Sequence, residues 1–329
     1  MAAPMDGKAL AAEVREQLTA EVQRLPAPPG LHVILVGARS DAKAYMQPLQ
    51  KLCRQIGVQA ASTELHDNCS EDELRAAVAQ ANADPTVHGV LLQLPLPKHM
   101  DERAVLQLIA PEKDVDCLHP ISFGKLALRG YEPAAWPSVA AGCLALLERS
   151  NVELQGKRAT VIGRSDMVGL PTALMLQQSG ATVTVCHSDT PTNDTKAAAL
   201  AADIVVVAVG QPGFVKSSWI KPGAAVCDVG LNTIEDKAAA GGYRIVGDCE
   251  DTVQEVAGLL TPVPGGVAAL TVAMMLRNVV RLAKAAAAAA VDAKQRSAPS
   301  RTPPAVEEVA EAAAAGGAEL SELPEPPEE

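Results

Sequence analysis

A turn that contains two glycines carries the clearest chemistry in this sequence. The run GRSDMVGLP, residues 163–171, follows a predicted strand at 158–163 and precedes a helix predicted from about residue 168. Gly163 and Gly169 permit a tight turn and a close backbone approach, so free amide groups at the helix start can face a pyrophosphate. The spacing differs from the usual G-x-G-x-x-G, and a plain glycine turn at a strand end is the alternative interpretation.

The residues after the next predicted strand indicate which dinucleotide this turn would bind. Strand 181–186 is followed by His187 and Ser188, with no Asp or Glu at its end to bind the ribose 2′-hydroxyl of NAD. Arg164 lies inside the glycine turn, and its planar guanidinium offers paired donors to a phosphate. This combination favours a 2′-phosphate and hence NADP, and a surface salt bridge is the alternative role of Arg164.

Charge and composition exclude one large class of partner. The 329 residues include 28 Lys+Arg against 39 Asp+Glu, for a formal net charge of −11, and only two Phe, two Trp and three Tyr. Single-stranded nucleic acids require stacking platforms and basic grooves, so no nucleic-acid partner is expected. Eight Glu and one Arg fall within residues 301–329, and this acidic segment is predicted to be solvated and disordered.

The cysteines and histidines show no metal-binding spacing. No two of the seven Cys lie within four residues of each other, and the six His are also dispersed, so no metal site is predicted. Scattered thiols suit a reducing compartment, and the start of the chain enters an amphipathic pattern without an evident signal or transit peptide. No apolar run reaches the length of a membrane span. We therefore expect a cytoplasmic protein with no membrane partner.

The first part of the chain alternates between helical and strand patterns. Helix 6–24 is predicted with Asp6 as its N-cap, and Ser70 with Glu73 forms a capping-box signature at the start of helix 70–82. The other predicted elements are strand 31–37, helix 41–56, strand 58–65, strand 88–93 and a helix around 101–109. Continuous apolar strands separated by helices predict a mostly parallel sheet that is covered on both faces.

A second alternating unit follows an irregular stretch, 111–138, that contains six Pro or Gly residues. Its predicted elements are helix 139–149, strand 158–163, a helix from about 168, strand 181–186, helix 193–201, strand 203–209, strand 224–229 and helix 267–285. The predicted fold class is α/β with two domains, an N-terminal α/β domain at 1–138 and a Rossmann-like domain with a parallel sheet at 139–266. Helix 267–285 is expected to pack back on the first domain, and the Ala-, Pro- and Glu-rich segment 286–329 to be disordered.

A series of short runs gives the chain a resemblance to a known enzyme family over roughly residues 5–283. The runs are DGKAL (6–10), HGVLLQLPLPKH (88–99), PEKDVD (111–116), HPISFGKL (119–126), GRSDMVGLP (163–171), ATVTVCHSDT (181–190), ADIVVVAVGQP (202–212), IKPGAAVCDVGLN (220–232), VGD (246–248) and TPVPGGV (261–267). In this order they resemble the bifunctional methylenetetrahydrofolate dehydrogenase/methenyltetrahydrofolate cyclohydrolase family. The resemblance implies a homodimer that oxidises 5,10-methylenetetrahydrofolate with NADP and hydrolyses the product to 10-formyltetrahydrofolate, with folate bound on the N-terminal side of a cleft.

The resemblance also implies roles for individual residues. Tyr45 would pack near the pterin and the reacting carbon, Gln93 would hold a hydrogen bond beside the catalytic group, and Asp116 would bind the amino edge of the pterin. The loop residues that would line the folate and nicotinamide side are Pro262, Val263, Pro264, Gly265 and Gly266. The implied cofactor residues are Gly163, Arg164, Ser165, Gly169 and Ser188, of which Arg164 and Ser188 would bind the 2′-phosphate. Without the resemblance, Tyr45 is a half-buried core aromatic and Asp116 a turn-capping residue.

Departures from the family pattern cluster on the folate side. Leu49 stands where the family has a Lys that is thought to serve the cyclohydrolase step, and Lys51, about 200° further around the helix, is no easy replacement. The other departures are Ala42, Cys117, Ser138 to Ala140 and Ala268 to Leu270. We predict an active dehydrogenase with weak or absent cyclohydrolase activity, which Leu49→Lys would raise if the rest of the pocket is competent. The alternative is a catalytically silent relative that serves as a binding or regulatory subunit.

Overall fold

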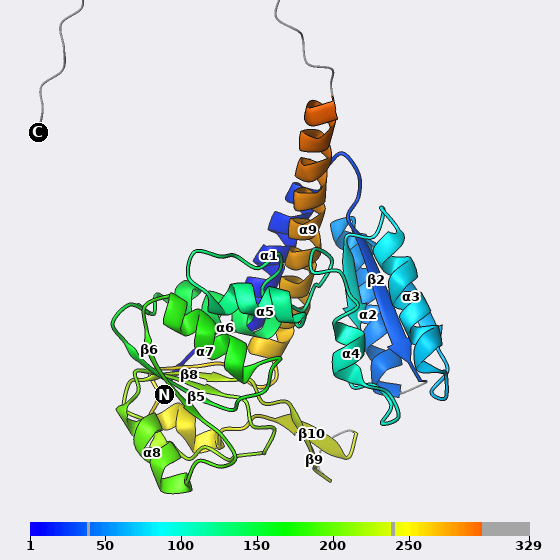
Figure 1. The fold of residues 1–329 in the computed structure, drawn as a ribbon. Helices are drawn as coiled ribbons and strands as arrows, with labels where there is room; N and C mark the ends of the chain where they lie inside the picture. Colours follow the sequence, from blue (N-terminus) through cyan, green and yellow to red (C-terminus); the bar gives the residue numbers. More distant parts are fainter. Residues whose placement is uncertain (38–39, 238–240, 298–329) are drawn as a thin grey trace, which may run out of the picture. The chain divides into compact units, whose positions relative to one another are not determined.

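The computed structural model describes residues 1–37, 40–237 and 241–297, without the side chains of 40–45 and 294–297. The helices, labelled in Figure 1, are α1 (Gly7–Val22), α2 (Ser40–Ile56), α3 (Glu71–Ala83), α4 (Glu102–Leu106), α5 (Pro120–Ala127), α6 (Ser138–Arg149), α7 (Gly169–Gln178), α8 (Thr192–Ala201) and α9 (Val267–Ser297). The strands are β1 (Ala3–Pro4), β2 (Gly30–Val36), β3 (Gln59–Leu65), β4 (Gly89–Leu92), β5 (Arg158–Ile162), β6 (Thr182–Cys186), β7 (Ile204–Val207), β8 (Ala225–Asp228), β9 (Asn232–Glu235), β10 (Tyr243–Val246) and β11 (Leu259–Leu260). Strands and helices alternate, which confirms the predicted α/β class.

Three parallel strands form the first sheet, in the order β3-β2-β4. The central strand β2 contributes side chains to two apolar cores, because its side chains alternate between the two faces of the sheet. Val33 and Leu35 belong to one core, and Ile34 packs in the other with Leu74 of α3. Both faces of β2 are therefore buried, which explains why its sequence GLHVILV is almost continuously apolar.

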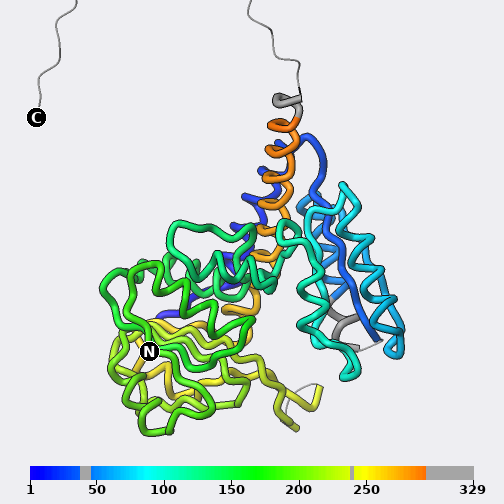
Figure 2. Tube along the Cα trace, viewed as in Figure 1, coloured from blue at the N-terminus to red at the C-terminus, as the bar shows by residue number. Residues whose placement is uncertain are grey.

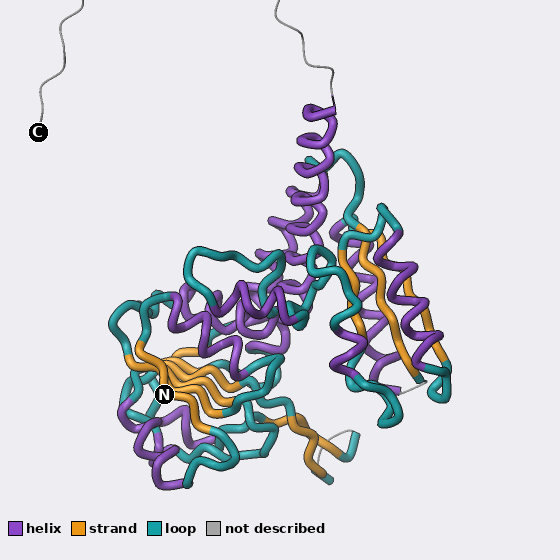
Figure 3. The backbone as a smooth tube through the Cα atoms, viewed as in Figure 1, coloured by secondary structure: helices purple, strands orange, loops and turns teal. Residues whose placement is uncertain are grey.

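Six parallel strands form the second sheet, in the order β1-β11-β8-β7-β5-β6. Figure 3 shows helices on both sides of its strands. On one side, Leu176 of α7 belongs to the core that holds Val161 and Val206, and on the other Ala199 of α8 packs with Val207. The chain order reverses at β5, between its neighbours β6 and β7, and ligands of open parallel sheets bind at the carboxyl ends of strands at such a point.

The two ends of the described chain are joined to this architecture in different ways. β1 pairs in parallel with β11, so residues near the N-terminus extend the second sheet. α1 lies alongside α9 (Figure 2), held by a 3.0 Å hydrogen bond from Arg277 Nη2 to Gln17 Oε1 and a 2.6 Å ion pair of Lys284 with Glu21. The predicted helix 267–285 is thus observed as the longer α9, whereas the predicted domain boundaries stay a prediction. Most of the predicted disordered tail, residues 298–329, lies outside the described residues.

Two predicted helix starts are confirmed by their caps. The Asp6 carboxylate accepts a hydrogen bond from the Ala9 amide at 3.0 Å, at the start of α1. Ser70 and Glu73 form the complete capping box at the start of α3. These side chains use amide groups that would otherwise lack partners in the first helical turn.

The expectation of irregular structure over 111–138 is wrong in part. α5 begins at Pro120, a residue suited to the first helical turn because its missing N–H has no partner there anyway. His119 caps this helix, since its Nδ1 accepts a hydrogen bond from the Ile121 amide at 3.0 Å. The antiparallel pair β9–β10 is a further element that the sequence pattern did not reveal, because neither strand has a buried residue and neither is a continuous apolar run.

Candidate active site

The dinucleotide turn has the tight geometry expected from its glycines. Gly163 follows β5 with a φ of 125°, and a Cβ there would lie 2.2 Å from the carbonyl oxygen of Ala208. A Cβ on Gly169, the first residue of α7, would lie 2.1 Å from the Gly163 carbonyl oxygen. The Gly169 amide also donates to Ser165 Oγ at 3.4 Å. Neither glycine position tolerates a side chain, and the start of α7 is held close to the end of β5.

A cavity of about 380 Å³ opens beside this turn. Gly163, Arg164 and Ser188 line it, together with His187 and Gln211. These residues come from the carboxyl ends of β5, β6 and β7, where a doubly wound sheet binds a dinucleotide. The structure therefore brings together three of the five predicted cofactor residues, and the other two belong to the adjoining turn.

Arg164 forms an ion pair in the structure, whereas the sequence analysis assigned its guanidinium to the 2′-phosphate of NADP. Its Nη2 lies 2.5 Å from Oδ2 of Asp189, one residue beyond Ser188. The Ser188 hydroxyl contacts the other oxygen of the same carboxylate, Oδ1, at 3.5 Å. The alternative role of Arg164, a salt bridge, is thus present in this structure, and both predicted 2′-phosphate ligands share one carboxylate.

A buried carboxylate holds the loop that follows β7. Asp248 is 0% exposed and accepts hydrogen bonds from the amides of Val209 and Gly210 at 2.7 and 2.9 Å, and from Nδ2 of Asn232 at 2.7 Å. Val209 lines the cofactor cavity. Asp248 therefore fixes one wall of that cavity through the backbone.

A second buried carboxylate braces the first. Asp228, at the end of β8, accepts hydrogen bonds from the amides of Gly230, Asp248 and Cys249 at 2.8 to 2.9 Å. Burial raises the pKa of Asp228 above its ordinary value even though these three amides favour the charged form. The Asp228 carboxylate thereby links the run DVG (228–230) to the run VGD (246–248), which begins 18 residues later.

A second cavity, of about 350 Å³, brings together Gln93 and Asp116. Gln93 follows β4, and its amide donates to the Ile34 carbonyl of the central strand at 2.9 Å. Ser138 at the start of α6 and Met167 of the dinucleotide turn line the same cavity. The cavity thus adjoins the turn that borders the cofactor cavity, as a substrate site next to a nicotinamide would.

Two polar groups in this second cavity have no partner in the described part of the chain. Ser138 is 7% exposed, and its hydroxyl makes no hydrogen bond. The Asp116 carboxylate has no hydrogen-bond donor on it, and burial together with the nearby Asp114 raises its pKa to about 7. A buried polar group without a partner costs about 1–3 kcal/mol, so such groups are expected where a ligand completes their hydrogen bonds.

The turn that carries Asp116 is fixed from two sides. The Asp114 carboxylate accepts a hydrogen bond from the His119 amide at 2.9 Å. From α9, Asn278 Nδ2 donates to the carbonyl of Val115 at 2.8 Å. Because Asp114 and Asn278 are both buried, these bonds hold Asp116 at the cavity wall although it lies on a loop.

Cys117, next to Asp116, occupies a strained backbone position. Its φ is 59°, in the left-handed region, and its side chain is 0% exposed. We expect Cys117→Gly to be more stable than Cys117→Ala by about 1 kcal/mol, because both remove the thiol but only glycine adopts this φ without a Cβ penalty. Urea unfolding of the two variants measures the difference, and an alanine variant equal to or more stable than the glycine variant contradicts the assignment of strain.

The position that replaces the family Lys lies in the core. Leu49 of α2 is 1% exposed and belongs to the same apolar core as Cys53, one turn further along. Lys51 is exposed and lines neither cavity, in agreement with its predicted direction. The backbone of Tyr45 belongs to α2, but the side chain for which a role was predicted lies outside the described residues.

The loop before α9 is not part of the described lining of the second cavity. Pro262, Gly265 and Gly266 are not among the described residues that line it. The Gly265 carbonyl accepts a hydrogen bond from the Lys8 amide at 3.1 Å, and the Gly266 amide donates to Pro262 at 2.7 Å, so the loop is tied to α1 and to itself. It leads into α9, whose Thr271 and Met275 do line the cavity. The predicted role of this loop in binding folate stays a prediction.

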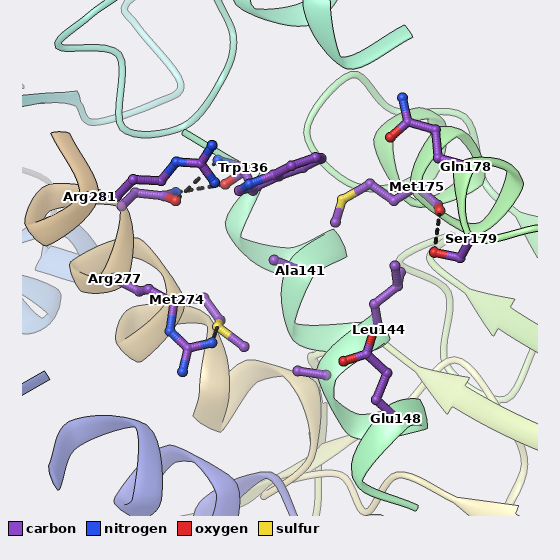
Figure 4. Close-up of a pocket in the computed structure, with 12 residues that line it drawn as sticks. Trp136, Ala141, Leu144, Glu148, Met175, Gln178, Ser179, Met274, Arg277 and Arg281 are labelled. Atoms are coloured by element: carbon purple, nitrogen blue, oxygen red, sulfur yellow. Dashed lines mark hydrogen bonds between the residues drawn. The ribbon is translucent and has the colours of Figure 1, made fainter. Parts of the chain in front are cut away.

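A third cavity, of about 440 Å³, lies between α6, α7 and α9 and contains none of the predicted site residues (Figure 4). Its two arginines are used within the chain. Arg281 lies over the Trp136 ring at 5.5 Å and pairs with Glu132 at 3.0 Å, and Arg277 bonds to Gln17. The predicted residues Gly163, Arg164, Ser188, Gln93 and Asp116 line the other two cavities.

The described part of the chain has neither a cluster of metal ligands nor a helix suited to span a membrane. No group of three or more His, Cys, Asp or Glu there could hold a metal ion, and all seven cysteines are free and buried. None of the helices described is long and apolar enough to cross a bilayer.

The fold and the two adjoining cavities define a dinucleotide-dependent α/β enzyme. More specifically, the chain belongs to the tetrahydrofolate dehydrogenase/cyclohydrolase family. The family's catalytic domain matches residues 5–116, and its NAD(P)-binding domain matches residues 137–287. This match confirms the resemblance noted from the short runs and the predicted nicotinamide dinucleotide.

Known relatives cover most of the chain. Bifunctional protein FolD 4, chloroplastic, from Arabidopsis thaliana is 48% identical over 287 residues, which are 85% of this chain and 79% of the relative. The methylenetetrahydrofolate dehydrogenase-cyclohydrolase of Trypanosoma brucei, solved with NADP and an inhibitor, has a TM-score of 0.82 at 41% identity and covers 87% of this chain and 98% of its own. The enzyme of Campylobacter jejuni has a TM-score of 0.80 at 37% identity, covering 87% and 99%.

Sequence reasoning missed two residues that the structure places in or beside the cavities. Asp189 lies three residues beyond the end of β6 at Cys186, where an acidic residue was sought, and the pairing of β5 with β6 brings it to Arg164. Ser138 was noted as a departure from the family pattern, but its unpartnered hydroxyl depends on packing that no sequence motif records.

Proposed function

We propose that this chain oxidises 5,10-methylenetetrahydrofolate to 5,10-methenyltetrahydrofolate with NADP as hydride acceptor, and hydrolyses the product weakly or not at all. The observation that carries this proposal is the second cavity, where Asp116 and Ser138 present unpartnered polar atoms next to Met167 of the dinucleotide turn. Membership of the family supports the class of substrate and cofactor.

Asp116 is proposed to hold the pterin. The pterin edge carries a ring N–H beside an amino group, and two parallel donors match the two oxygens of a carboxylate. The ionised form of Asp116 would accept both bonds, which would offset the cost of its burial. Ser138 and Gln93 would supply further hydrogen bonds, and Tyr45 would stack on the ring.

In the hydride step, the main task of the protein is to align the nicotinamide with the reacting carbon of the substrate. When bound, NADP supplies the acceptor carbon of the nicotinamide. The glycine turn would set the position of its pyrophosphate, and the apolar wall of the second cavity, which includes Leu91, Leu92 and Met275, would keep water from the reacting carbons. No general base is required for this step.

The same cavity offers little help to the hydrolytic step. Its described lining contains no Lys or Arg, but it contains two carboxylates, Asp116 and Glu102. Fixed negative charge stabilises the cationic methenyl product, and the described lining has no cationic group to polarise it for attack by water. The proposed result is release of 5,10-methenyltetrahydrofolate.

The ratio of the two products tests this proposal. NADPH and 5,10-methenyltetrahydrofolate are followed together by their absorbance, with a blank for spontaneous hydrolysis. We expect close to one methenyl product for each NADPH in the early reaction. Formation of NADPH with 10-formyltetrahydrofolate and no methenyl accumulation would show that the cyclohydrolase is intact.

Leu49→Lys is expected to destabilise the fold by about 2–4 kcal/mol and to leave hydrolysis unrestored. The position is buried in the core and does not line the second cavity, so an ammonium group there would lose its hydration without reaching substrate. Leu49→Met is the matched control and should cost less than about 1.5 kcal/mol. Urea unfolding and the rate of methenyl consumption are the measurements, and a tenfold faster consumption by the lysine variant would contradict the placement of this residue.

Two further parts of the proposal concern the whole protein. A homodimer formed through the dinucleotide domain stays a prediction, which β6 supports as an edge strand with its Val185 partly exposed. The cytoplasmic location also stays a prediction, because relatives at 48 and 42% identity are chloroplastic and mitochondrial proteins.

A further inference from the structure

The turn after β6 places a carboxylate where the proposed cofactor's 2′-phosphate would bind. Ile162 of β5 pairs with Cys186 of β6, so the residues that follow these two strands leave the sheet side by side. Asp189 meets Arg164, which lines the 380 Å³ cavity, at 2.5 Å. Their side chains are 53% and 70% exposed, so solvent and ligands have access to both.

The carboxylate engages both groups that were assigned to the phosphate. One oxygen of Asp189 pairs with the Arg164 guanidinium, and the other lies 3.5 Å from the Ser188 hydroxyl. A 2′-phosphate must take at least one guanidinium donor from Asp189 and must then lie beside its negative charge. An exposed ion pair is worth only about 0–1 kcal/mol, so the exchange is possible, but the like-charge contact persists after it.

NAD would make a different contact with Asp189 and Arg164. Its ribose 2′-hydroxyl is a hydrogen-bond donor, and a carboxylate near the end of the second strand is the usual acceptor for it. Asp189 can accept this bond while it keeps its ion pair with Arg164. The pair therefore offers a cation to a 2′-phosphate and an acceptor to a free hydroxyl.

We propose that Asp189 determines cofactor specificity in this enzyme by competing with the 2′-phosphate for Arg164 and Ser188, which narrows the preference for NADP over NAD. This inference rests on the proposed dehydrogenase function for its kinetic consequences, whereas the competition itself concerns binding alone. Other charged and polar groups around Asp189 do not remove the competition. His187 Nδ1 lies 3.7 Å from Asp189 Oδ2, and it accepts a hydrogen bond from the Asp189 amide at 3.3 Å.

Asp189→Asn in the full chain tests the proposal, because asparagine keeps the shape and removes the charge. We expect kcat/KM for NADP to rise about tenfold, equivalent to about 1.4 kcal/mol, while kcat/KM for NAD stays level or falls. The matched control is Glu153→Gln, which removes an exposed carboxylate from an ion pair with Lys157 outside the cavity and should leave the ratio unchanged.

Calorimetry with 2′,5′-ADP and 5′-AMP provides a readout that does not depend on turnover. The variant should bind 2′,5′-ADP about tenfold more tightly and 5′-AMP with little change. If catalysis is absent while this binding shift appears, the proposed function fails and the inference stands. A variant with an NADP/NAD ratio and a 2′,5′-ADP affinity within twofold of the parent, or with weaker 2′,5′-ADP binding, overturns the inference.

Discussion

Replacing Asp116 with Asn should lower kcat/KM for 5,10-methylenetetrahydrofolate by about 10²- to 10³-fold while it makes the fold more stable above neutral pH. The activity falls because an amide cannot accept from both pterin donors at once, and two charge-assisted hydrogen bonds are worth about 3–4 kcal/mol. The stability rises because Asp116 is partly buried without a hydrogen-bond donor among the described residues, and desolvation together with the nearby Asp114 raises its pKa to about 7.

The pH dependence of the stability follows from the direction of that shift. The ordinary pKa of the group is 3.8, so the folded protein holds the Asp116 proton more tightly than the unfolded chain does. Below about pH 4 both states are protonated and the residue carries no penalty, and the penalty then grows until it is complete above about pH 7. The full shift corresponds to about 4 kcal/mol, and the partial exposure of the side chain reduces the expected effect to about 2 kcal/mol.

Urea unfolding at pH 4 and pH 8 measures this effect on the variant and on the parent. We expect a gain of about 2 kcal/mol for Asp116→Asn at pH 8 and almost none at pH 4. Glu16→Gln, which removes an exposed carboxylate from α1, is the control and should change neither value by more than about 0.5 kcal/mol. A variant that is less stable at pH 8, or that keeps more than a tenth of the parent's kcat/KM, would contradict the assignment of Asp116 to the substrate.

Asp248→Ala should destabilise the protein by about 3–5 kcal/mol. The substitution removes the acceptor for the amides of Val209 and Gly210 and for the side chain of Asn232, and all three donors lose a buried partner. Because Val209 lines the cofactor cavity, the molecules that remain folded should also bind dinucleotide more weakly.

Circular dichroism during urea unfolding measures this loss. Asp251→Ala is the matched control, because Asp251 lies nearby, exposed, at the start of a short 3-10 helix (Asp251–Glu255) and should change the stability by no more than about 0.5 kcal/mol. A loss below about 1 kcal/mol for Asp248→Ala would mean that the loop after β7 is held by other contacts.

The main features of the fold could be predicted because the sequence patterns that indicate them are local. β7 is a continuous apolar run and β2 is nearly one, and strands covered on both faces favour such runs. The positions of Gly163 and Gly169 were predictable for the same reason, since a tight strand-to-helix turn demands residues without a Cβ. By contrast, β1 was missed because two residues carry no periodic pattern, and its pairing with β11 joins residues more than 250 positions apart.

Residues of the candidate site could be predicted from the sequence only where they lie within a recognisable motif. Roles for Gln93 and Asp116 were implied by the family runs HGVLLQLPLPKH and PEKDVD that contain them, and the structure places both residues in one cavity. The contact of Arg164 with Asp189 depends on the register of β5 against β6, and the burial of Leu49 depends on which face of α2 meets the core. Neither can be derived from spacing along the chain.

The initial rate of NADPH formation tests the central claim most directly. Full-length parent protein, Asp116→Asn and a reaction without enzyme receive the same 5,10-methylenetetrahydrofolate and NADP, and NADPH absorbance is followed in parallel. We predict a clear rate for the parent and a rate at least about 10²-fold lower for the variant. A parent rate equal to that of the reaction without enzyme would contradict the account and would favour a catalytically silent member of the family.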